Sequence, residues 1–147
     1  MGEYYPERGA GPNFVPAYQA SGVPFVTSSL SSDLTTTPVQ IDFPYVTRFF
    51  VVNNIGSVPI RVGFTENGVN AKGSGNSSNY FLLEASGSTG RLELRCKSLF
   101  IRTSNSTGGY TLLAGLTGIS SGQFPVLTGT VSGSAPGPVD EKFQGVG

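Results

Sequence analysis

Apolar and polar residues alternate along most of residues 23–119, with the two-residue period that is typical of β-strands. Residues 91–96, RLELRC, carry the clearest alternation. Leu92, Leu94 and Cys96 are predicted to face the core, and the charged residues between them are predicted to face solvent. Since no second cysteine is present, we expect Cys96 to be a buried free thiol.

Residues 46–54, VTRFFVVNN, place apolar side chains on both faces, which predicts a central strand with both faces covered. Turn residues (Gly, Asn, Ser, Pro) separate eight such segments, a spacing typical of a two-sheet sandwich or barrel. No segment shows a convincing helical stripe. We therefore predict an all-β domain over residues 23–119, an antiparallel eight-stranded β-sandwich of the single jelly-roll type. The predicted strands are residues 23–30, 38–43, 46–54, 58–64, 79–84, 91–96, 98–103 and 109–119.

The two ends of the chain lack this periodicity. Residues 1–22 are rich in Gly, Pro and Tyr, and residues 120–147 are rich in Gly, Ser and Pro, so we predict two extended arms. Exposed aromatic side chains are costly in water, which suits an N-terminal arm that orders against a neighbouring subunit. A disordered tail is the alternative at this point. The aromatic residues of this predicted assembly arm are Tyr4, Tyr5, Phe14 and Tyr18.

Composition excludes several classes of function. Only 12% of residues are charged and the formal net charge is zero, so the surface offers little attraction to nucleic acid. The chain has no histidine and one cysteine, so the usual zinc sites and histidine-activated nucleophiles cannot be built. No apolar run is long enough to span a bilayer. We expect a protein that is not an enzyme and has no catalytic, cofactor or metal site.

Residues 68–79, GVNAKGSGNSSN, are the most loop-like stretch and the first candidate for a phosphate-binding loop. A Walker loop requires Gly-Lys-Ser/Thr at its end, but Ser74 occupies the lysine position and no helix is predicted to follow. We interpret the stretch as a long exposed loop between two strands, carrying Lys72 and Asn76. Asn76 and Asn105 match glycosylation acceptor triplets, but without a signal peptide glycosylation is not expected.

The acidic and basic residues of the domain form no predicted site. Asp42 and Glu93 stand at outward strand positions and are interpreted as solvated charges. Glu66 lies in a predicted turn, where one carboxylate is thin support for calcium binding. The arginines of two neighbouring predicted strands are interpreted as interface or sheet-surface residues. They are Arg91, Arg95 and Arg102.

In strand rhythm, roughly residues 23–120 resemble the single jelly-roll capsid proteins of large icosahedral double-stranded DNA viruses. The resemblance is carried by PVQIDFPYVTRFFVVNN, PIRVGFTENGV, NYFLLE, LELRCKSLFIRT and YTLLAGLTGI. It implies a structural protein of the virion, the penton, whose homopentamers close the fivefold vertices among double jelly-roll major capsid proteins and minor capsid proteins. It implies no role for any particular residue.

Two other functions stay open at this point. One is a cement, fibre or tail-associated β-sandwich of a capsid, which copy number per particle distinguishes from a penton. The other is a carbohydrate-binding jelly roll, in which exposed aromatic rings stack on sugars. Its only candidate residues are Tyr45, Tyr80 and Tyr110, and the absence of tryptophan weakens it.

Overall fold

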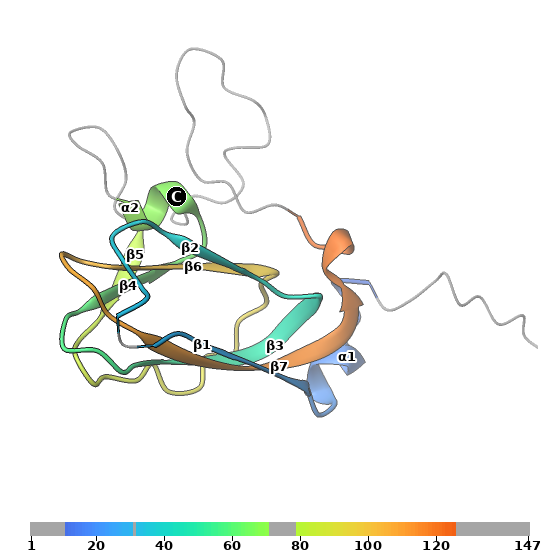
Figure 1. Ribbon diagram of the computed structural model, residues 1–147. Coiled ribbons are helices and arrows are strands. Elements are labelled where there is room, and N and C mark those ends of the chain that lie inside the picture. The colour runs from blue at the N-terminus through green and yellow to red at the C-terminus, as the bar shows by residue number, and fades with distance from the viewer. Residues whose placement is uncertain (1–10, 31, 71–78, 126–147) are drawn as a thin grey trace, which may run out of the picture.

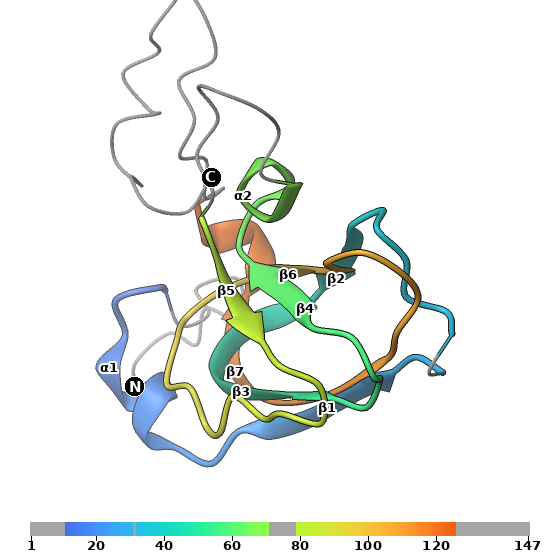
Figure 2. The same cartoon turned by 90° about the vertical axis from the view of Figure 1, so that its left-hand side faces the viewer.

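The protein is a β-sandwich of two antiparallel sheets that lie face to face (Figures 1 and 2). The computed structural model describes residues 11–30, 32–70 and 79–125, which contain seven strands. The first sheet has the order β1 (Val23–Ser28), β7 (Tyr110–Ser120), β3 (Tyr45–Asn54). The second has the order β2 (Val39–Asp42), β6 (Ser98–Thr103), β4 (Ile60–Gly63), β5 (Tyr80–Leu83). The prediction of an all-β sandwich is confirmed.

In the described ranges, three short helical turns accompany the strands: α1 (Val15–Gln19), α2 (Glu66–Asn70) and η1 (Ser121–Gln123). Each is too short to show an apolar stripe, which explains why the sequence pattern did not predict them. Helix α2 lies against β4 and β6, with Val69 fully buried. Val69 reaches the sheet because Gly63 has no side chain; a Cβ there would lie 2.7 Å from Val69 Cγ1.

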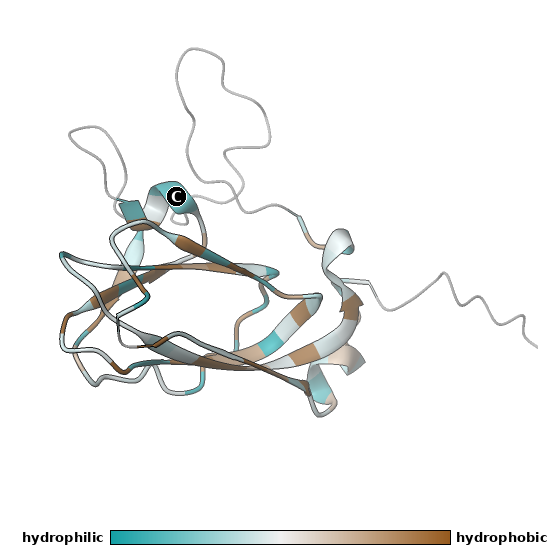
Figure 3. Ribbon diagram, viewed as in Figure 1, coloured by the Kyte–Doolittle hydropathy of each residue, from teal (hydrophilic) through white to brown (hydrophobic). Residues whose placement is uncertain are grey.

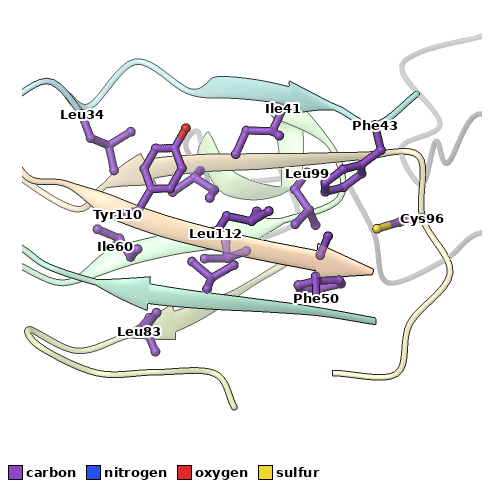
Figure 4. Packing of buried hydrophobic residues seen from close by; sticks show 14 of the residues in the cluster. Leu34, Ile41, Phe43, Phe50, Ile60, Leu83, Cys96, Leu99, Tyr110 and Leu112 are labelled. Atoms are coloured by element: carbon purple, nitrogen blue, oxygen red, sulfur yellow. The ribbon is translucent and has the colours of Figure 1, made fainter. Parts of the chain in front are cut away.

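The core lies between the two sheets and is built mostly from the inward positions of the strands, with Leu34, Phe43 and Cys96 added from the connections (Figure 4). Phe50 and Val52 of β3 are fully buried, whereas Phe49 and Val51 on the other face are only partly buried. The prediction that both faces of this strand are covered is therefore only partly correct. Figure 3 shows apolar residues along the strands of both layers. Each fully buried aliphatic or aromatic side chain contributes about 1.5–3 kcal/mol to folding.

The predicted strand at residues 91–96 is wrong, and the structure has seven strands in its described part rather than eight. Leu92 exchanges backbone hydrogen bonds with Phe50 of β3, but the Leu94 amide then donates to the Leu92 carbonyl, only two residues back. This turn ends the regular ladder, and Leu94 is 42% exposed instead of facing the core. Alternation in sequence does not reveal such a turn, because it depends on what the neighbouring strand offers.

The hydroxyl of Thr47, on β3, replaces part of the missing ladder. Thr47 Oγ1 donates to the Leu94 carbonyl at 2.7 Å and accepts from the Cys96 amide at 2.9 Å. The Thr47 amide also donates to the Cys96 carbonyl at 3.0 Å. The segment therefore still runs along the free edge of β3, held by side-chain as well as backbone hydrogen bonds.

The described part of the N-terminal arm, residues 11–22, is not extended throughout. Residues 15–19 form α1, in which Pro16 occupies the first turn, where its missing amide costs no hydrogen bond. The Ala20 amide closes the turn on the Pro16 carbonyl. At the other end, β7 ends at Ser120 and η1 follows directly.

Candidate interaction surfaces

Two arginine side chains hold residues 11–22 against their own domain through hydrogen bonds. Arg48 of β3 donates from Nε to the Tyr18 carbonyl at 2.5 Å. Arg95 donates from Nη1 to the Pro12 carbonyl at 3.1 Å, and its guanidinium lies 5.1 Å from the centre of the Tyr18 ring. The Tyr18 hydroxyl donates to the same Pro12 carbonyl at 2.7 Å. The contacts of Tyr18 are therefore with this domain, while Phe14 remains 51% exposed.

Four of the residues singled out from the sequence fall outside the described part of the chain. They are Tyr4, Tyr5, Lys72 and Asn76. The loop at residues 68–79 is described only at its ends: Gly68, Val69 and Asn70 belong to α2, and Asn79 precedes β5. The second acceptor triplet lies in the connection between β6 and β7, where Asn105 is exposed.

The outer surface of the β1-β7-β3 sheet is apolar at its centre. Val26 of β1 pairs with Leu113 of β7, which pairs with Val51 of β3, so three aliphatic side chains form one row across the sheet. Val26 is 70% exposed and Leu113 is 44% exposed. In the adjoining row, Pro24 and Phe49 flank Gly115. We call this surface the outer apolar face; it comprises Pro24, Val26, Phe49, Val51 and Leu113.

An arginine borders the outer apolar face. The Arg91 guanidinium lies 4.4 Å from the centre of the Phe49 ring, a cation–π distance. Arg91 Nη2 also pairs with Glu93 Oε1 at 2.7 Å, and both side chains are about half exposed. An ion pair as exposed as this contributes little to stability. Its position gives the apolar surface a polar border.

The three arginines grouped in the sequence analysis do not share one face. Arg91 and Arg95 lie in the segment along β3, whereas Arg102 lies on β6, in the second sheet. The residue directly opposite Arg102 is Arg61 of β4, which was not among the arginines grouped from the sequence. Only the register between β4 and β6 brings this pair together, so alternation alone cannot reveal it.

The three candidate sugar-stacking tyrosines do not gather. Tyr110 is buried in the core, with 5% exposure. Burial raises the pKa of its hydroxyl, and a hydrogen bond with Thr27 opposes that rise. Tyr45 and Tyr110 stand at opposite ends of the β3–β7 ladder, and Tyr80 lies on the other sheet beneath Arg61. The arrangement gives no common stacking surface.

Cys96 is a fully buried free thiol, as expected. Burial raises its pKa to about 11, and the hydrogen bond with Thr47 lowers it by less. The thiol is therefore protonated at neutral pH, which does not suit a nucleophile. Glu66, the carboxylate weighed for calcium, is exposed in α2, and the described residues contain no group of three or more metal-ligating side chains.

The described helices are all too short and too polar to cross a membrane. Comparison with protein-family models, with curated proteins and with solved structures found no match to this chain.

Proposed function

We propose that this chain is a structural protein of a viral capsid and that its sandwich is a single jelly roll. The pairing order of the strands carries the proposal. If the irregular segment beside β3 is counted as the sixth of eight strands, β6 becomes the seventh strand and β7 the eighth. The first strand then pairs with the eighth, the second with the seventh, the third with the sixth and the fourth with the fifth. This is one long antiparallel hairpin, wrapped so that its third and fourth strands also pair with the eighth and seventh. A double Greek key of this kind is the jelly-roll arrangement.

The outer apolar face supports a role in assembly. An exposed apolar row rimmed by polar groups is the usual character of a protein–protein interface. Val26 and Leu113 are exposed in the single chain. A surface that covers them stabilises the assembly by about 25 cal/mol for each Å² of apolar area removed from water. We infer that the covering surface is a second copy of this chain.

A homopentamer at the fivefold vertex is the specific form that we propose. A closed ring requires two different patches on each copy, one that meets the copy before it and one that meets the copy after it. The outer apolar face serves as one of these patches. We propose that the described part of the N-terminal arm stays on its own domain and contacts the neighbouring major and minor capsid proteins through Phe14, which is 51% exposed.

The mass of the assembled state tests this proposal. Purified full-length protein is measured by light scattering and by negative-stain electron microscopy between about 1 and 100 µM. We expect particles of five copies with fivefold symmetry. A protein that stays monomeric throughout this range, and is absent from the vertices of its parent particle, contradicts the penton role. A different closed copy number favours the cement or fibre alternatives.

A further inference from the structure

Two arginines lie directly opposite each other on the outer surface of the second sheet. Arg61 of β4 and Arg102 of β6 are register partners in the antiparallel pair. Like charges in this position repel each other and destabilise a sheet. Burial and the charge of Arg61 lower the pKa of the Arg102 guanidinium. The pair is thus an unfavourable arrangement for the isolated fold.

Neutral oxygen atoms at the end of α2 accept hydrogen bonds from both guanidinium groups. Arg61 Nη1 donates to the Val69 carbonyl at 3.3 Å, and Arg102 Nη1 donates to the Asn70 side-chain oxygen at 3.0 Å. The Arg61 guanidinium also lies 4.6 Å from the centre of the Tyr80 ring. These contacts orient the two groups side by side, but none of them supplies a negative charge.

No described carboxylate balances this charge. The ion pair present in the described ranges joins Arg91 to Glu93, in the irregular segment along β3. Arg61 Nε is buried and has no hydrogen-bond partner in the part of the chain that the structure describes. A buried donor left without a partner costs about 1–3 kcal/mol, and more when it is charged. The arrangement therefore carries two positive charges and at least one unused donor.

We propose that Arg61 and Arg102 bind a tetrahedral oxyanion of the phosphate or sulfate class. Guanidinium groups recognise such anions through paired, charge-assisted hydrogen bonds, and two of them match a doubly charged ligand. Stacking on Tyr80 holds the Arg61 guanidinium beside Arg102, so that an anion lying between the two arginines meets both charged groups. This site does not depend on the capsid role.

Titration with inorganic phosphate tests the site. The arginine Nε–H signals are followed by NMR at constant ionic strength, with sodium chloride replaced stepwise by phosphate. We expect saturable shifts of the Arg61 and Arg102 signals, with half-saturation at roughly 1 mM for a partly exposed site of this kind. Sulfate is expected to act like phosphate, and acetate is expected to act at least tenfold more weakly.

Variants separate binding from general charge effects. Arg102→Gln is expected to weaken phosphate binding at least tenfold. Arg102→Lys keeps the charge but loses the planar fork, so binding is expected to weaken several-fold while the sheet is preserved. Arg91→Gln, which removes an exposed arginine from the segment along β3, is the matched control and should leave the titration unchanged. Shifts that are absent, that do not saturate, or that acetate reproduces overturn the proposal.

Discussion

The ring of Phe49 lies across Gly115 of the neighbouring strand. The two residues are register partners in the β3–β7 pair, and a Cβ atom added to Gly115 would lie only 2.3 Å from Cε1 of Phe49. A glycine inside a strand weakens it, because the backbone is less restricted and no side chain packs. In this protein the glycine makes room for an aromatic ring on the outer surface of the sheet, which Arg91 covers in turn.

Replacing Gly115 by alanine is expected to destabilise the fold by about 1–3 kcal/mol, because the Phe49 ring must leave its position. Chemical denaturation measures the loss. In the double variant Phe49→Ala/Gly115→Ala the clash is absent. Its loss of unfolding free energy should therefore be smaller than the sum of the losses in the two single variants. Gly118→Ala is the control, since a Cβ there meets nothing within 4 Å. An unchanged unfolding midpoint for Gly115→Ala contradicts the packing described.

The buried thiol of Cys96 predicts a loss of stability at high pH. Its pKa is raised from 9.0 to about 11, so the unfolded chain ionises in this range while the folded protein keeps the proton. The stabilising contribution is complete below pH 9 and disappears as the pH rises towards 11, by roughly 3 kcal/mol. Unfolding free energies of the parent and Cys96→Ala proteins, measured from pH 8 to 11, provide the test.

The difference between these two proteins isolates the thiol, because the other groups that titrate in this range are common to both. We expect the advantage of the parent over Cys96→Ala to shrink as the pH increases. A difference that stays constant across this pH range shows that the thiol is not protected from ionisation, and it refutes the prediction.

Asn54 is expected to be among the most sensitive polar positions. It is 3% exposed, and its Nδ2 donates to the carbonyls of Val58, Leu83 and Glu84 while its Oδ1 accepts from the Gly56 amide. Asn54→Asp removes the donors and places a negative charge among carbonyl oxygens, which we expect to cost about 3 kcal/mol or more.

Thermal and chemical unfolding of Asn54→Asp measure this cost. Asn105→Asp makes the same chemical change at an exposed loop position and should alter stability by less than about 0.5 kcal/mol. Equal effects at the two positions argue against a bridging role for Asn54 between β3 and the loops around it.

The outer apolar face predicts a variant that folds but does not assemble. Val26→Asp places a charge on a side chain that is 70% exposed in the single chain, so the fold should lose little stability. If a second copy covers this face, the buried charge opposes association and the oligomer should dissociate. Light scattering compares it with Thr36→Asp, an exposed loop control. Assembly of Val26→Asp at parent concentrations excludes this face from the interface.

Short-range pattern predicted most of the strands. Ile60 and Val62 are buried and Arg61 points outward, as their alternation indicates, because one face of a half-buried strand must be apolar. The same argument failed at residues 91–96, because the Leu94 amide bonds to the Leu92 carbonyl in a tight turn and the Leu94 side chain is exposed. Alternation predicts which side chains face the core. It does not predict whether the neighbouring strand can continue the ladder of backbone hydrogen bonds.

The sequence by itself determined that this chain is a β-sandwich and that Cys96 lies inside it, since both follow from apolar periodicity and composition. Only the tertiary structure decided which distant residues meet. Arg61 faces Arg102, Phe49 covers Gly115, and Tyr18 rests on its own domain rather than reaching away from it. The physical reason is that the register between strands far apart in the chain is set by the packing of two whole sheets, which no local pattern contains.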